Sequence, residues 1–146
     1  MKGFGNKQTN RKKGTSSSLQ KEINKITKSS NEQLITKALK YHSEGDFLNA
    51  ERHYELCLKQ ESNDPRVLSN YGLICKEACR FEEAIKLWKK SIELYPENPK
   101  PYYNLSNLLI DIQRFKEAEV FIKEVINIKP DDYKMHYNLG ITLRNN

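Results

Sequence analysis

The chain has 146 residues, of which 37% are hydrophobic and 30% charged, and its formal net charge is +6 at pH 7. This length and composition suit one domain with a thin, continuous core and exclude a globule with a deep interior. No apolar run approaches the ~18 residues that span a bilayer. The start also lacks the apolar segment of a secretory signal, so the sequence predicts a cytoplasmic protein.

Residues 1–30 form a basic tail with eight Lys or Arg side chains and one Glu, a net charge of +7, so the rest of the chain carries −1. Residues 1–18 contain too little apolar surface to offset the entropy of ordering and are expected to be disordered. Leu19, Ile23 and Ile26 predict a short basic lead-in helix that docks on the following structure. This tail loosely resembles an organelle transit peptide, and it is the one segment expected to attract nucleic acid or an anionic membrane surface.

A 34-residue pattern begins after the tail, and its clearest markers, Asp64-Pro65 and Asn98-Pro99, lie one period apart. A period of this length indicates paired helices stacked in an array. The pattern divides residues 31–146 into repeats 31–64, 65–98 and 99–132 and a partial repeat, 133–146. The residue before each repeat can cap the first turn of a helix: these caps are Ser30, Asp64, Asn98 and Asp132.

Residues at equivalent positions of the repeats predict how the helices pack. Positions 8 and 20, counted from the first residue of each repeat, are small, as expected where two antiparallel helices cross closely. Position 8 holds Ala38, Gly72, Ser106 and Gly140, and position 20 holds Ala50, Ala84 and Ala118. Position 17 holds Phe47, Phe81 and Phe115, and position 24 holds Tyr54, Trp88 and Ile122. Three-residue turns centred on Gly45, Cys79 and Gln113 are short enough to make each repeat a helical hairpin, and Gly45 fits such a turn best. The second helices are expected to end before Ser62, Pro96 and Pro130.

These positions resemble the signature of the tetratricopeptide repeat (TPR) family, which has a small residue at position 8, Ala at 20, a bulky residue at 24 and Pro at 32. The resemblance covers Asn31 to Pro130 as three repeats and continues through residues 133–140. The first repeat departs from it at Lys37, where Leu is usual, and at Ser62, where Pro is usual. The resemblance implies an all-α, right-handed α-solenoid whose first helices line a concave, protein-binding face.

The partial repeat leaves two interpretations open. Its helix can cap the apolar face of the third repeat, with Ile141 and Leu143 turned toward that face. Because the pattern stops where a second helix should begin, the chain can equally be the front of a longer protein.

The cysteines and histidines do not form a pattern that predicts chemistry. Cys57 and Cys75 fall at packed positions, where a thiol behaves as a small hydrophobe, and the odd cysteine, Cys79, lies in a turn. We expect all three to be reduced. No second cysteine pair completes a tetrahedral zinc site, and there is no Gly-rich phosphate loop. The sequence therefore predicts no enzyme activity, no cofactor and no metal.

The candidate binding site lies on the first helices, opposite the small packing positions. Three ladders of equivalent residues are expected to line it: Arg66, Lys100 and Lys134 at position 2, Ser69, Tyr103 and Tyr137 at position 5, and Asn70, Asn104 and Asn138 at position 6. An Asn amide matches one peptide unit, tyrosine offers stacking area, and a cation attracts carboxylates. The sequence therefore predicts a scaffold that binds an extended, acidic peptide segment of another protein. The alternative role of the Asn ladder is to solvate the groove or to join neighbouring helices.

Two more specific functions occur within the family that this chain resembles. TPR co-chaperones hold the carboxylate tail of heat-shock chaperones with Lys at position 5 and Asn at position 9 of one repeat, Asn at 6 of the next, and Lys at 2 with a cation at 6 of the third. Asn70 and Lys100 fit this clamp, but Ile35, Leu39 and Asn104 do not, so such a partner is not expected. Some bacterial TPR proteins that this chain resembles carry a transferase or oxygenase domain after the array. The second hypothesis is therefore a substrate-recruiting arm of a larger enzyme.

Overall fold

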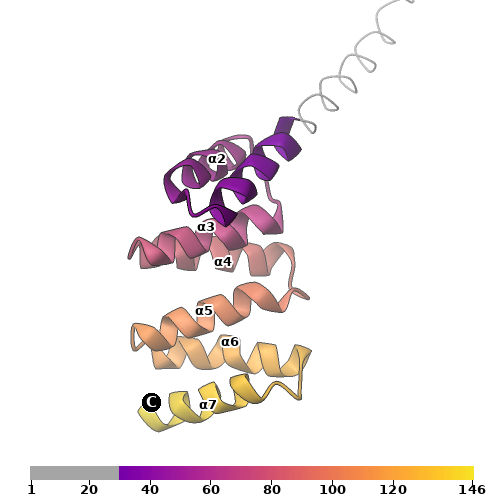
Figure 1. The fold of residues 1–146 in the computed structure, drawn as a ribbon. Coiled ribbons are helices and arrows are strands. Elements are labelled where there is room, and N and C mark those ends of the chain that lie inside the picture. The colour runs from indigo at the N-terminus through magenta and orange to yellow at the C-terminus, as the bar shows by residue number, and fades with distance from the viewer. Residues whose placement is uncertain (1–29) are drawn as a thin grey trace, which may run out of the picture.

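The computed structural model describes residues 30–146, so the tail and its predicted lead-in helix lie outside the described residues. Within residues 30–146 the chain forms seven helices and no strand. After a helix that covers residues 30–43 come α2 (Phe47–Lys59), α3 (Pro65–Glu77), α4 (Phe81–Leu94), α5 (Pro99–Asp111), α6 (Phe115–Ile128) and α7 (Tyr133–Asn145). Figure 1 shows the hairpins stacked in chain order, from the indigo end to the yellow end. The predicted all-α stack of hairpins is confirmed.

The helix caps follow the sequence pattern in three of four cases. Asp64 accepts a hydrogen bond from the backbone N–H of Arg66 (2.8 Å), Asn98 from that of Lys100 (3.2 Å) and Asp132 from that of Met135 (3.0 Å). Pro65 and Pro99 take the first helical positions, where a missing N–H has no cost. The cap predicted at Ser30 is wrong, because residue 30 is itself helical.

Each hairpin turn contains one residue with a positive φ at position 15 of its repeat. Gly45 has φ +77°, and the equivalent residues Cys79 and Gln113 have φ 57° and 60°. Glycine adopts this left-handed conformation without steric penalty, whereas other residues incur roughly 1–2 kcal/mol. The turn prediction is thus confirmed, and two of the three turns are strained relative to the first.

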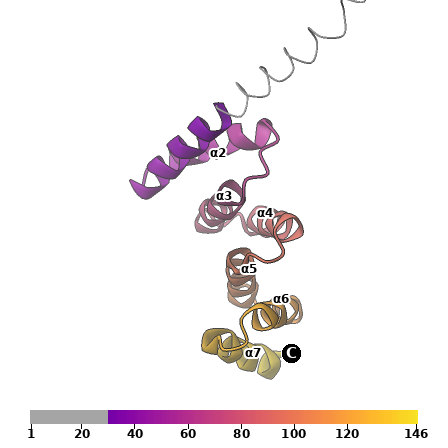
Figure 2. The same ribbon diagram turned by 90° about the vertical axis from the view of Figure 1, so that its right-hand side faces the viewer.

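The core lies between the two rows of helices. Figure 2 shows α3, α5 and α7 along one side of the stack and α4 and α6 along the other. The bulky position-24 side chains of Tyr54, Trp88 and Ile122 are fully buried, as are the alanines at position 20. The crossing of α3 and α4 is so close that a Cβ added to Gly72 would lie 2.4 Å from Trp88 Nε1. The small residues at positions 8 and 20 therefore make the hairpins possible, as predicted.

The last helix, α7, packs on the third repeat through one face only. Met135 and Thr142 are buried and Ile141 is half-buried, in agreement with a helix that covers the end of the core. Leu143, however, is 55% exposed. The expectation that it turns toward the third repeat is wrong: the buried stripe of α7 runs through Met135 and Thr142, and Leu143 lies about 100° around the helix from Thr142.

Two cysteine thiols are packing groups. Cys57 and Cys75 are fully buried, and burial raises the pKa of Cys57 to about 11 and that of Cys75 to about 12. Both thiols are therefore protonated at neutral pH, whereas Cys79 is exposed in its turn.

In the described part of the chain, no three His, Cys, Asp or Glu side chains gather as metal ligands, and no helix is long and apolar enough to cross a membrane.

Candidate functional site: a groove along the first helices

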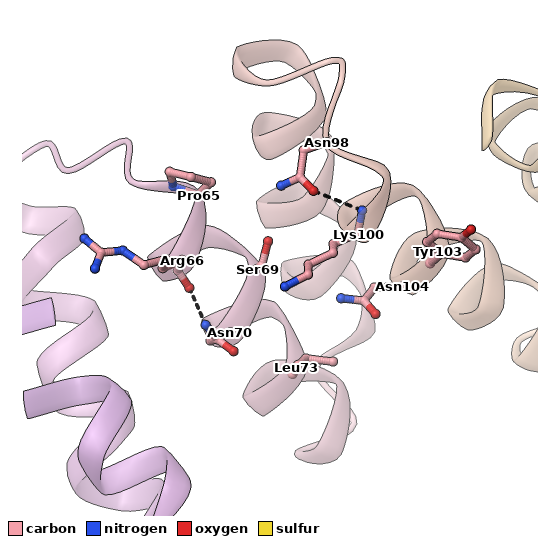
Figure 3. Close-up of a pocket in the computed structure, with 9 residues that line it drawn as sticks. All are labelled: Pro65, Arg66, Ser69, Asn70, Leu73, Asn98, Lys100, Tyr103 and Asn104. Atoms are coloured by element: carbon pink, nitrogen blue, oxygen red, sulfur yellow. Dashed lines mark hydrogen bonds between the residues drawn. The ribbon is translucent and has the colours of Figure 1, made fainter. Parts of the chain in front are cut away.

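A pocket of about 390 Å³ lies between α3 and α5. Six of the nine predicted site residues line it, namely Arg66, Ser69, Asn70, Lys100, Tyr103 and Asn104, together with Pro65, Leu73 and Asn98. Figure 3 shows Lys100 reaching from α5 toward α3, with Asn104 beside it, whereas Arg66 points away toward the preceding repeat. The repeat period therefore places the predicted residues of two successive helices around one space.

A second pocket, of about 670 Å³, lies between α5 and α7. It contains the three remaining predicted residues, Lys134, Tyr137 and Asn138, and it shares Tyr103 with the first pocket. Asn107, Asp132, Tyr133 and Met135 complete its lining. We call the surface formed by these two pockets the first-helix groove.

Arg66 is not available to a ligand in the way that the sequence predicted. Its guanidinium donates to both carboxylate oxygens of Glu32 (3.1 and 2.9 Å) and to both of Asp64 (3.0 and 2.8 Å). The hydrogen bond to Asp64, and to a lesser extent that to Glu32, raises the pKa of Arg66. The same contact lowers the pKa of Asp64. Arg66 therefore joins the first two repeats, and its charge is already balanced by two carboxylates.

The equivalent lysines of the next repeats differ from Arg66. Lys100 and Lys134 are exposed and make no ion pair within residues 30–146. The pocket of Lys100 contains no acidic side chain, whereas that of Lys134 includes Asp132. Of the three position-2 cations, Lys100 is therefore the one that has neither an ion pair within residues 30–146 nor an acidic side chain in its pocket.

The three asparagines of the ladder have three different environments. Asn70 donates its side-chain amide to the carbonyl of Arg66 in its own helix (2.8 Å). Asn138 donates to Asn107 on the neighbouring helix (2.9 Å), which is the structural role considered as the alternative. Asn104 makes no side-chain hydrogen bond to any described residue, so its whole amide, with two N–H donors and one acceptor, is open to a ligand.

The position-5 residues also differ along the groove. Tyr103 donates its hydroxyl to Asp132, and burial together with this bond raises its pKa to about 12. Tyr137 is 70% exposed, which leaves its ring available for stacking. The hydroxyl oxygen of Ser69 is covered by neighbouring atoms and has no hydrogen-bond partner in the described chain.

Sequence reasoning missed several residues that shape the groove. The sequence pattern predicts Asp132 only as a helix cap, although its carboxylate also accepts a hydrogen bond from the Tyr103 hydroxyl. Lys76 of α3 and Asp111 of α5 form an ion pair across the repeats, with Nζ and Oδ2 3.2 Å apart. The pairing of Glu32 with Arg66 was detectable, because opposite charges occupy position 2 of successive repeats.

Comparison with known proteins agrees with this fold. Residues 77–139 match the family model described as Tetratricopeptide repeat. No curated protein sequence matches the chain. Among solved structures, the Arabidopsis OM64 TPR domain is 16% identical with a TM-score of 0.71, over 81% of this chain and 98% of that one.

Two further structures have the same fold. The first TPR of Spaghetti (RPAP3), bound to HSP90 peptide SRMEEVD, is 18% identical with a TM-score of 0.70, over 78% of this chain and 90% of that one. A mutant of Thermobaculum terrenum O-GlcNAc transferase is 22% identical with a TM-score of 0.67, over 80% of this chain and 22% of that one. These likenesses establish the fold alone. With the repeat pattern and the family match over residues 77–139, they show that the described chain has the tetratricopeptide-repeat fold.

Proposed function

We propose that this protein is an interaction scaffold that binds an extended, acidic segment of another protein in the first-helix groove. The observation that carries this proposal is the pocket between α3 and α5, where the cation of Lys100 lies beside the amide of Asn104 and neither has a partner among residues 30–146. A carboxylate at Lys100 and a peptide unit at Asn104 would satisfy both groups.

The proposed ligand extends along the groove from this pocket. Lys134 is equivalent to Lys100 one repeat later, and adjacent packed helices lie about 8–10 Å apart. An extended chain covers that distance in about three residues, at 3.3–3.6 Å each. We therefore expect acidic residues about three positions apart, with an aromatic or apolar side chain near the exposed ring of Tyr137.

The chaperone tail held by the RPAP3 domain is not the ligand proposed for this chain. The first half of the co-chaperone clamp falls here on Ile35 and Leu39, of which Ile35 is 3% exposed and part of the core. A buried isoleucine offers no cation to a terminal carboxylate. The peptide SRMEEVD thus serves as a negative control with a similar acidic composition.

The test is a binding assay with the full chain and a peptide array that varies the number and spacing of acidic residues. Lys100→Ala should weaken binding of acidic peptides about tenfold, which corresponds to one lost charge-assisted hydrogen bond. Arg66→Ala should have a smaller effect, because this side chain is already paired. Lys90→Ala is the matched control, since Lys90 is exposed on α4 outside the groove and makes no ion pair within residues 30–146.

Two results would contradict the proposal. One is the absence of binding by wild-type protein that circular dichroism shows to be helical. The other is an equal loss in the Lys100 and Lys90 variants, which would indicate general attraction to positive charge.

The second candidate function is the substrate-recruiting arm of a larger transferase or oxygenase. Its support is the likeness to the transferase structure, of which this chain corresponds to 22%. A recruiting arm must contact many unrelated substrates through peptide units. In that case Asn104→Ala should weaken every bound peptide alike, and Lys100→Ala should matter little.

A further inference from the structure

The two pockets of the first-helix groove are lined by equivalent positions of successive repeats, so they can be compared residue by residue. Position 5 of the earlier helix is Ser69 in the pocket between α3 and α5, and Tyr103 in the pocket between α5 and α7. The first and fourth repeats also have a bulky residue at this position, Ile35 and Tyr137. Ser69 is therefore the one small side chain in this row of the sequence.

In the pocket between α5 and α7, the tyrosine of position 5 reaches across to the next first helix. The Tyr103 hydroxyl donates a hydrogen bond to the carboxylate of Asp132, which caps α7. Pro99, one turn before Tyr103, does not line that pocket. The space between two neighbouring first helices of this protein thus accommodates a tyrosine whose hydroxyl meets the cap of the following helix.

The pocket between α3 and α5 receives no such ring from α3. The Ser69 hydroxyl has no hydrogen-bond partner in the described chain, and Pro65, one turn before it, lines the pocket. Figure 3 shows Ser69 between Pro65 and Asn98, the cap of α5, with the Asn98 amide nitrogen on the side of Pro65. Among residues 30–146 Asn98 bonds only through its side-chain oxygen, to the backbone N–H of Lys100 (3.2 Å). No side chain of α3 therefore takes the place that Tyr103 has in the next repeat.

Position 9 also differs between the two pockets. Asn107 lines the pocket between α5 and α7 and accepts a hydrogen bond from Asn138 (2.9 Å). The equivalent residue in the pocket between α3 and α5 is Leu73, which is half-buried against the core. Leu73 and Pro65 give this pocket an apolar wall that a ring can cover without the loss of a side-chain hydrogen bond. Its volume of about 390 Å³ is in the range of small-ligand sites, roughly 300–1,000 Å³.

We propose that the pocket between α3 and α5 binds a tyrosine side chain of the acidic partner segment. The ring lies over Ser69 and against Leu73, and the hydroxyl bonds to the Asn98 amide, which has both a donor and an acceptor. This inference rests on the proposed function of the groove and adds the identity of one ligand side chain.

The position of this tyrosine in the partner follows from the pocket that it shares with Lys100. In an extended segment, side chains two residues apart point to the same side. The tyrosine is therefore expected two residues from the acidic residue that Lys100 attracts. It lies on the α3 side of that residue, away from the second acidic residue at Lys134.

The probes are fluorescein-labelled peptides added to the full chain. The peptide GSYADAADSG has a tyrosine two residues before the first of two aspartates, and GSDAADAYSG has the same pattern for a segment that binds in the opposite direction. Matched peptides have phenylalanine or alanine in place of the tyrosine. In one of the two directions the tyrosine peptide should bind about tenfold more tightly than the alanine peptide, with the phenylalanine peptide between them.

Two variants of the chain test where the tyrosine binds. Ser69→Tyr gives α3 the residue that α5 and α7 already have at this position. It should reduce binding of the tyrosine peptide to the level of the alanine peptide, and binding of the alanine peptide should change less than about twofold. Circular dichroism checks that this variant is helical.

The second variant, Asn98→Asp, keeps a helix cap and gives the hydroxyl a carboxylate like that of Asp132. The added negative charge should weaken all the acidic peptides. The ratio of tyrosine to phenylalanine binding should nevertheless rise about threefold, because a hydrogen bond to an ionised acceptor is stronger.

Three results would overturn the inference. Wild type could bind the tyrosine and alanine peptides equally while Lys100→Ala still weakens both, in which case the proposed function stands and the tyrosine site does not. A helical Ser69→Tyr could weaken both peptides to the same extent, or Asn98→Asp could leave the ratio of tyrosine to phenylalanine binding unchanged. If folded wild type binds none of the peptides, the proposed function itself fails, and this inference fails with it.

Discussion

The helices α3 and α7 have the same place in the 34-residue pattern, two periods apart, yet their glycines have opposite environments. Gly72 lies under the Trp88 ring, and Gly140 has no neighbour within 4 Å of an added Cβ. The comparison teaches that a repeat signature specifies a surface, whereas the contact made by that surface depends on the element beside it. The same holds for Arg66, which has two ion pairs, and Lys100, which has none within residues 30–146.

The largest expected effect is the loss of the side chain that covers Gly72. Trp88→Ala should lower the free energy of unfolding by about 3–5 kcal/mol, because it leaves a cavity in the core between α3 and α4. Tyr137→Ala, at an exposed ring of α7, should change it by less than about 0.5 kcal/mol. Urea denaturation of both variants measures the difference, and similar losses of stability would mean that the ring of Tyr137 is covered in solution.

The next largest effect on stability is expected from replacing Gly72 or Gly140 with alanine. Gly72→Ala should destabilise the protein by about 1–3 kcal/mol, because the added methyl group clashes with the indole ring. Gly140→Ala should stabilise it by up to about 1 kcal/mol, since alanine is the better helix former and has free space here. The urea midpoints of the two variants should therefore shift in opposite directions, and a destabilised Gly140→Ala would show that the space beside Gly140 is filled.

The hairpin turns provide a third comparison, between Gly45 and Cys79. Both have a positive φ, so Cys79→Gly should relieve strain and stabilise the protein by about 1 kcal/mol. Gly45→Ala should destabilise it by a similar amount, because alanine must adopt the left-handed conformation. Thermal melts of the two variants test this, and a neutral result for both would show that the turns relax.

The smallest expected effect on stability concerns the helix caps Asp64 and Asn98, of which only Asp64 titrates. Hydrogen bonds from Arg66 hold the pKa of Asp64 below its unfolded value of about 3.9. Because the folded pKa is lowered, this contribution to stability is present above about pH 4 and is lost as the pH falls through the native pKa. Asp64→Asn keeps a capping oxygen, as in Asn98, but does not titrate.

The measurement is the urea midpoint of wild type and Asp64→Asn between pH 7 and pH 3. The wild type should be the more stable protein at pH 7, and the difference between the two urea midpoints should become smaller toward pH 3. Other carboxylates titrate in both proteins, so the difference between them reports Asp64. If the difference in urea midpoint does not change with pH, the ion pair between Asp64 and Arg66 contributes nothing to stability.

Much of the fold was predictable because its signals are local and periodic. The caps at Asp64, Asn98 and Asp132 depend on one side chain and the next helical turn, and the small positions recur every 34 residues. The residues that line the groove were predictable for the same reason, since equivalent positions of successive helices lie on one surface. The cap at Ser30 failed because the helix already includes that residue, which a capping pattern alone does not reveal.

The sequence by itself determined the helices, their hairpins and the identity of the residues along the groove, because backbone propensity and repeat period act over a few residues at a time. Only the tertiary structure decided which of those residues are free. Arg66 binds Glu32, Tyr103 binds Asp132, and Asn138 binds Asn107, whereas Lys100 and Asn104 remain unpaired within residues 30–146. The physical reason is that each pairing requires two side chains on different helices to meet, and this depends on the spacing and rotation of the packed helices.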